Sequence, residues 1–102
     1  MKLKYALLIG VLSASPFSAN ANFSSCDSVA SLSKNIIYYR QAGEPMNDLV
    51  KMLGDLMLDA WVSEIVISAF DTPKMGTIEA VARVSLEFEN YWYNECIKSL
   101  KG

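Results

Sequence analysis

The longest apolar stretch of the chain runs from Leu56 to Phe70, LMLDAWVSEIVISAF. On a helix, its few polar residues fall in two narrow strips on roughly opposite sides: Asp59, Ser63, Glu64 and Ser68. A helix that is apolar nearly all round is buried. The stretch is too short and too charged to span a membrane, which takes about 20 mostly apolar residues. We therefore expect the central helix of a small bundle, covered by the segments on either side.

A first helix is predicted between Ser25 and Gly43. Ser24 and Ser25 can cap its start, and Asp27 places an acid in its first turn. Apolar residues then recur at helical spacing: Val29, Leu32, Ile36 and Tyr39. Gly43 fits the C′ position just past the helix end, and Pro45 prevents the helix from resuming.

A short helical segment follows, in which Asn47 can act as the cap and Asp48 lies in the first turn. Gly54 and Asp55 then indicate a break and a new cap before the central helix. The alternative is one continuous helix from Asp48 to Phe70, because a lone glycine costs only about 1 kcal/mol inside a helix.

The last helix is predicted from about Ile78 to Ser99. Pro73 and Gly76 mark residues 71–76 as a loop, and Thr77 can cap the helix. One helix face is predicted to point inward: Ile78, Val81, Ser85, Phe88, Trp92 and Cys96. No strand pattern is strong enough to claim. The chain is therefore predicted to be all-α, a three- to four-helix bundle closed by one disulfide.

The N-terminus has the form of a cleaved secretory signal peptide over residues 1–21. Lys2 and Lys4 precede a short apolar run, and residues 19–21, Ala-Asn-Ala, fit a cleavage site. Cleavage would leave residues 22–102 as a single helical domain, periplasmic or secreted from a bacterium. The alternatives are an N-terminal anchor helix and a lipoprotein acylated at Cys26.

Cys26 and Cys96 lie near the two ends of the mature chain. In an oxidising compartment, an isolated pair predicts one disulfide. The chain-entropy model gives such a bond about 4 kcal/mol of stabilisation, because it closes most of the mature chain into a loop. The alternative is two free thiols that bind a metal or form a redox couple, but the chain has no Cys-x-x-Cys motif and no histidine.

The mature chain is acidic. The whole chain has 9 Lys+Arg and 11 Asp+Glu, and Lys2 and Lys4 belong to the signal peptide, so seven basic residues oppose eleven acidic ones for a net charge of −4. The basic residues are scattered along the sequence. We therefore expect no nucleic-acid partner, and no membrane association after signal cleavage.

The absence of histidine removes Ser-His-Asp, Cys-His and most metal-hydrolase arrangements. A glycosidase needs two carboxylates that face each other across a cleft, and a bundle of this size has little room for one. We expect no enzyme, no catalytic residue, no metal and no cofactor. A small hydrolase stays as an alternative.

Three consecutive aromatic residues, Tyr91, Trp92 and Tyr93, lie among acids in the last helix. Each helical residue turns by about 100°, so the three cannot all face one core, and at least one tyrosine should face solvent or a partner. A protein partner or a homodimer could use these residues, or Trp61 on the central helix. The alternative is that Trp92 is core and both tyrosines lie flat with hydrated hydroxyls.

Two further groups are interpreted more simply. Arg40, near the end of the first helix, is interpreted as a surface charge that matches the helix dipole. Four methionines are interpreted as core filling, with an adaptable apolar groove as the alternative: Met46, Met52, Met57 and Met75.

Several segments carry a resemblance to a known group of proteins: Cys26, Arg40-Gln41-Ala42-Gly43-Glu44-Pro45, Ala69-Phe70-Asp71-Thr72-Pro73, Phe88 and Cys96. Over most of its mature length, the chain resembles small exported, often prophage-associated, bacterial two-cysteine helical proteins of unassigned function. This resemblance implies no catalytic residues. The chain is also similar to periplasmic acid-stress chaperones in size and cysteine count.

The expected function is therefore protein–protein binding by an exported helical protein. The main alternative is an acid-stress chaperone, because neutralising all eleven carboxylates would leave +7 on the mature chain and loosen a small bundle.

Overall fold

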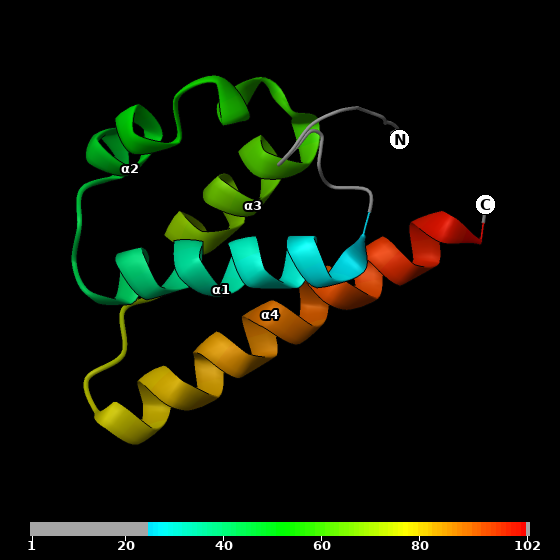
Figure 1. The fold of residues 1–102 in the computed structure, drawn as a ribbon. Helices are drawn as coiled ribbons and strands as arrows, with labels where there is room; N and C mark the ends of the chain where they lie inside the picture. The colour runs from blue at the N-terminus through cyan, green and yellow to red at the C-terminus, as the bar shows by residue number, and fades with distance from the viewer. Residues whose placement is uncertain (1–24, 102) are drawn as a thin grey trace. The chain divides into compact units, whose positions relative to one another are not determined.

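A computed structural model describes residues 25–101. In this part of the chain there are four α-helices, one 3₁₀ helix and no strand (Figure 1): α1 (Cys26–Gln41), α2 (Met46–Leu53), η2 (Gly54–Leu58), α3 (Ala60–Asp71) and α4 (Ile78–Leu100). The predicted all-α fold is confirmed. None of these described helices is long and apolar enough to cross a membrane. The predicted signal peptide, residues 1–21, lies outside the described residues.

The chain divides into two compact units. The disulfide unit contains, among the described residues, 25–32 and 90–101, which are the start of α1 and the end of α4. The central unit is residues 33–89, which hold the rest of α1, then α2, η2 and α3, and the first half of α4.

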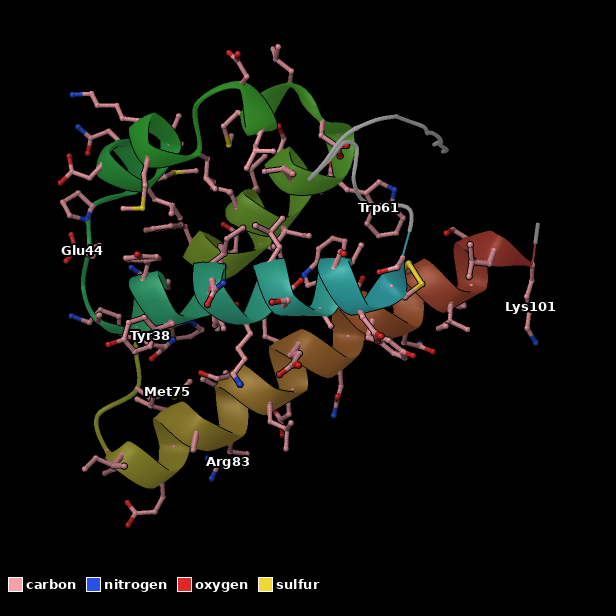
Figure 2. The ribbon with its side chains drawn as sticks, in the orientation of Figure 1. Tyr38, Glu44, Trp61, Met75, Arg83 and Lys101 are labelled. Carbon is pink, nitrogen blue, oxygen red and sulfur yellow. A yellow bond between two sulfur atoms is a disulfide. The ribbon has the colours of Figure 1, made fainter. Side chains whose placement is uncertain are left out.

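In the disulfide unit, Cys26 is bonded to Cys96, with their Cα atoms 5.5 Å apart and 70 residues apart in sequence (the yellow bond in Figure 2). The predicted disulfide is confirmed. The alternative of two free thiols is wrong, and the sulfur that a lipoprotein would use is already bonded. Three apolar residues are buried with the disulfide: Val29, Ala30 and Trp92.

Both predicted ends of α1 are confirmed. At its start, the Ser25 hydroxyl oxygen accepts a hydrogen bond from the backbone N–H of Ser28, at 3.2 Å. At its end, Gly43 has a φ of 89°, a left-handed conformation that favours glycine. The Glu44 N–H donates to the Tyr39 carbonyl and the Gly43 N–H to the Arg40 carbonyl, both at 3.1 Å. This is the Schellman arrangement that satisfies the last carbonyls of a helix.

The region between α1 and α3 differs from the prediction in its caps. α2 begins at Met46 directly after Pro45, so Asn47 lies inside the helix and does not cap it. Gly54 ends α2 with a φ of 55°, so the alternative of one continuous helix is wrong. The cap of α3 is Asp59 and not Asp55. Its Oδ1 accepts from the backbone N–H groups of Trp61 and Val62, at 2.8 and 3.4 Å.

The prediction that the central helix is buried all round is also wrong. α3 is shorter than the predicted 56–70, and it buries one face completely: Val62, Ile65, Val66 and Ala69. Ile67 is 49% exposed, and Leu58, now in η2, is 86% exposed. An apolar composition favours burial. A face of the helix is buried, however, only where a neighbouring element packs against it.

α4 begins where the sequence predicts, because the Thr77 hydroxyl oxygen accepts from the Ala80 N–H at 3.1 Å. Of its predicted inward face, Phe88, Trp92 and Cys96 are buried, whereas Ile78 is 86% exposed. Helical spacing fixes the direction in which a side chain points. Burial also requires a neighbouring element, and Ile78 in the first turn has none that covers it.

Candidate interaction surfaces

The tyrosine surface of the disulfide unit consists of Tyr91 and Tyr93, which are 54% and 39% exposed. Trp92, between them, is 8% exposed. This confirms that at least one tyrosine faces solvent and that Trp92 belongs to the core. Trp92 and Cys96 are one helical turn apart and both buried, so α4 is fixed here with one tyrosine on each flank.

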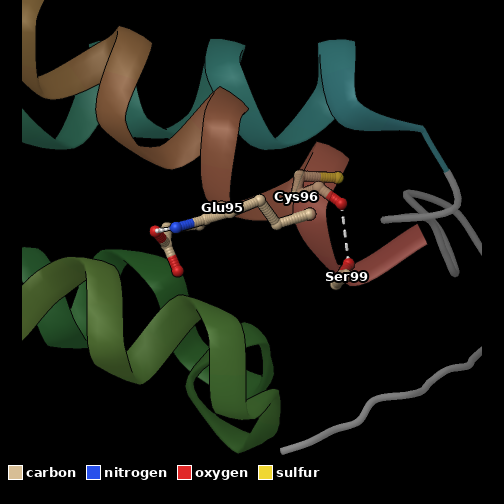
Figure 3. Close-up of polar contacts among 4 residues, drawn as sticks. Glu95, Cys96 and Ser99 are labelled. Atoms are coloured by element: carbon tan, nitrogen blue, oxygen red, sulfur yellow. Dashed lines mark hydrogen bonds and ion pairs between the residues drawn. The ribbon is translucent and has the colours of Figure 1, made fainter. Parts of the chain in front are cut away.

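Tyr91 is held by its neighbours on its own helix. Its ring meets the Trp92 ring edge to face, with the ring centres 5.2 Å apart and the planes at 89°. Such contacts add about 0.5 to 1.5 kcal/mol beyond buried area. On the same flank, Lys98 forms an ion pair with Glu95 at 2.9 Å (Figure 3). The hydrogen bond to Glu95, and then the charge of that carboxylate, raise the pKa of Lys98, and Tyr91 adds a smaller increase.

The other flank of α4 in this unit is apolar. Tyr93, Ile97 and Leu100 recur at helical spacing, with Ile97 half-buried and Leu100 70% exposed. In the last turns of α4, the Ser99 hydroxyl donates a hydrogen bond to the Cys96 carbonyl of the same helix, at 2.7 Å (Figure 3). The tyrosine surface therefore has two flanks, a charged one beside Tyr91 and an apolar one beside Tyr93.

Trp61, the other residue predicted for an interface, lies in the central unit (Figure 2). It is half-buried at the N-terminal end of α3, where its backbone N–H donates to Asp59. The sequence pattern alone gives no sign that Trp61 and the tyrosines belong to different units.

A second surface follows from the methionines. The methionine segment, residues 46–58, covers α2 and η2, which pack against each other, and η2 packs against α3. Four of its large apolar side chains are exposed: Met46 39%, Met52 61%, Leu56 37% and Leu58 86%. Met57 and Met75 are half-buried. Core filling is therefore the wrong interpretation of Met46 and Met52, and an adaptable apolar surface fits their exposure.

Three exposed acids accompany these apolar side chains. Glu44 lies on the connection into α2 (Figure 2), Asp48 in the first turn of α2 and Asp55 in η2. Lys51 is the one basic residue of residues 44–59. The segment therefore combines exposed apolar groups with an excess of negative charge.

The interpretation of Arg40 as a simple surface charge is wrong. Its Nε donates to the Thr72 carbonyl at 3.0 Å, and its guanidinium carbon lies 5.4 Å from the centre of the Phe70 ring. A guanidinium within about 6 Å of a ring centre is attracted to the ring face. Arg40 thus binds the end of α1 to the end of α3.

Gln41 makes the adjoining contacts, and sequence reasoning missed it. Its Nε2 donates to the Pro73 carbonyl at 2.9 Å, and its Oε1 accepts from the Met75 N–H at 2.8 Å. Gln41 is buried, four residues after buried Ile37. A polar residue at this inward position was the available signal, because buried polar groups need partners. The two longer segments that carry the family resemblance meet here.

The described residues contain no group of three or more Cys, Asp or Glu side chains that could hold a metal ion. Comparison with protein-family models, with curated proteins and with solved structures found no match. The resemblance to small exported bacterial proteins therefore stays a prediction.

Proposed function

We propose that this chain is an exported protein that acts by binding a protein partner rather than by catalysis, and that the tyrosine surface makes the contact. One observation carries the proposal: Tyr91 and Tyr93 are exposed on a helix whose intervening Trp92 is buried. Tyrosines are enriched among the residues that dominate binding energy, since they offer a large rigid surface with a polar tip.

Pre-organisation supports this assignment. The disulfide lies one helical turn beyond Trp92, and Tyr91 packs against the indole ring. A side chain that is already ordered loses less conformational entropy when it binds, so more of its contact energy becomes affinity. Truncating a tyrosine that anchors an interface costs about 2 kcal/mol or more in binding free energy.

Export is supported by two independent features. The sequence of residues 1–21 has the pattern of a signal peptide. The Cys26–Cys96 disulfide is typical of oxidising compartments. We place the protein in the bacterial periplasm or outside the cell, in keeping with its resemblance to small exported, prophage-associated proteins.

Site-specific photo-cross-linking in the producing cell tests the proposal. A photo-reactive phenylalanine analogue at position 91 or 93 should give one discrete cross-linked product. The matched control is position 31, because Ser31 is exposed in α1 of the same unit. It should not give this product. No product at 91 and 93, or the same product at all three positions, would refute the proposal.

The mass of the product identifies the partner class. A product of twice the chain mass indicates a homodimer, and any other discrete mass indicates a different protein. The acid-stress alternative is tested separately, by titrating the purified protein to low pH with an apolar dye and an aggregation-prone client. Dye binding and client protection that begin together would favour the chaperone over the proposed binding protein.

A further inference from the structure

We propose that the methionine segment is a second binding site, and that it takes a basic amphipathic helix of a partner protein. This inference goes beyond the proposed function, because the segment lies in the central unit and the tyrosine surface in the disulfide unit. It rests on exposure, on the support of the backbone and on charge.

Four of the eight large apolar side chains that are exposed in the central unit lie in one short stretch. Met46, Met52, Leu56 and Leu58 all belong to residues 46–58, in which Leu49 is the buried anchor at 2% exposed. Single exposed apolar residues are ordinary on a protein surface, whereas concentrated ones mark interaction sites. Methionine is unbranched and polarisable, so its side chain can adapt to differently shaped apolar partners.

The backbone beneath these side chains is well supported. Gly54 turns the chain from α2 into η2, and its N–H donates to the Val50 carbonyl. At the far end, the Ser63 hydroxyl donates to the Met57 carbonyl at 2.6 Å, and the Asp59 N–H donates to the Leu56 carbonyl at 3.0 Å. The segment thus presents flexible side chains on an ordered main chain, which limits the entropy lost on binding.

Charge complementarity selects the partner. Residues 44–59 contain four acidic residues and one lysine, a net charge of −3: Glu44, Asp48, Asp55, Asp59 and Lys51. An acidic, methionine-containing surface is complementary to a helix with one apolar and one basic face. Residues 44–59 of a second copy carry the same −3 charge and would be repelled. An anionic membrane would be repelled for the same reason.

An amphipathic helix is the conformation that we infer for the partner segment. Binding of an extended strand requires the free edge of a sheet, and no strand occurs in residues 25–101. Recognition therefore has to come from side chains, and the apolar face of an amphipathic helix supplies a row of them at helical spacing.

The test is a titration of the purified exported protein with a fluorescent leucine–lysine peptide of about 14 residues, four helical turns. Fluorescence anisotropy should show saturable binding that weakens with added salt, since exposed charges are screened beyond about 10 Å at 0.1 M salt. A leucine–glutamate peptide with the same apolar pattern should not bind. Equal binding of both peptides, or of neither, would overturn the proposal.

Matched variants locate the site. Leu58→Ser together with Met52→Gln should weaken peptide binding about ten-fold, because central apolar contacts carry most of the affinity. Ile78→Ser is the control, since Ile78 and Leu58 are both 86% exposed and only Leu58 lies in the segment. It should leave the affinity unchanged. If Ile78→Ser weakens binding as much as the double variant does, the site is not the methionine segment.

Charge variants and an independent surface complete the test. Asp48→Asn with Asp55→Asn should weaken binding and flatten its salt dependence, and an unchanged salt dependence would contradict the proposal. Tyr91→Ala with Tyr93→Ala should leave peptide affinity unchanged, so failure of the tyrosine surface and failure of this site are distinguishable. Preferential binding to phosphatidylglycerol vesicles would show a membrane site and overturn the assignment.

Discussion

The disulfide unit and the central unit hold their apolar side chains in place by different means. The disulfide unit has a small buried set around a covalent bond, and its described charges balance: Asp27 and Glu95 against Lys98 and Lys101. The central unit contains no disulfide, and nine acidic residues oppose five basic ones. It buries one face of α3 but leaves four large apolar side chains of the methionine segment exposed.

This difference teaches where a small chain can place binding surfaces. A cross-link supplies stability without apolar area, so the disulfide unit can leave two tyrosines exposed on a fixed helix. The central unit depends on a compact apolar core, and half of its exposed large apolar residues lie in the short elements α2 and η2. Substitutions in each unit separate the two sources of stability.

The largest effect is expected from removing the cross-link. Cys26→Ser together with Cys96→Ser should lower the free energy of unfolding by about 4 kcal/mol, because the bond no longer restricts a 70-residue loop in the unfolded chain. Urea unfolding of the variant and of the oxidised parent measures the difference. Equal urea-unfolding midpoints in the two proteins would show that the disulfide does not stabilise the fold.

Next come two isoleucines on one helix. Ile65→Ala should cost about 3 kcal/mol of unfolding free energy, because Ile65 is 0% exposed and its loss leaves a cavity. Ile67→Ala is the matched control at 49% exposed, and it should change stability by about 0.5 kcal/mol or less. Thermal and urea unfolding give both values. Equal losses would mean that α3 is buried on both faces after all.

Gln41→Leu should lower the free energy of unfolding by about 2 kcal/mol. The leucine fills similar space but leaves the Pro73 carbonyl and the Met75 N–H without their side-chain partner. Hydrogen exchange offers a local measurement, because the Met75 amide should exchange faster in the variant than in the parent. Unchanged protection of this amide would show that the contacts add nothing to the loop.

The cap of α3 has a smaller effect. Asp59→Ala should cost about 1 kcal/mol of unfolding free energy, since two backbone N–H groups lose an acceptor. Asp55→Ala removes the same carboxylate from an exposed position four residues earlier and should be near neutral. Urea unfolding of both variants decides between the two caps. A larger loss of stability in Asp55→Ala than in Asp59→Ala would show that Asp55 is the cap, as the sequence alone predicts.

The smallest effect concerns Lys98, whose side chain is exposed. Its pKa is raised above the ordinary 10.5 in the folded protein, so the folded state binds this proton more tightly than the unfolded state does. The resulting stabilisation is complete below pH 10.5 and is lost as the pH rises through the folded-state value. Nitrogen-detected NMR titration should show the pKa of Lys98 falling in Glu95→Gln, and an unchanged value would deny the ion pair any influence.

Local signals made much of the fold predictable. Ser25, Gly43 and Thr77 occupy the cap positions that their side chains or their backbone freedom favour. The cysteine pair was also predictable, because both residues lie on predicted inward faces near the two ends of the predicted mature chain. Asp59 and Asp55 show the limit. Both fit a cap, and a break at Gly54 alone does not say whether a 3₁₀ turn intervenes before α3.

The candidate interaction surfaces also combine features that the sequence predicted with features that it did not. The sequence by itself determined that Tyr91, Trp92 and Tyr93 cannot share one face, because that follows from the pitch of a helix. Only the tertiary structure decided that Trp92 is the buried one, that Met46 and Met52 lie outside the core and that Gln41 binds the loop after α3. Caps and turns depend on residues a few positions apart, whereas burial depends on which distant element packs against a face, and that is settled when the whole chain folds.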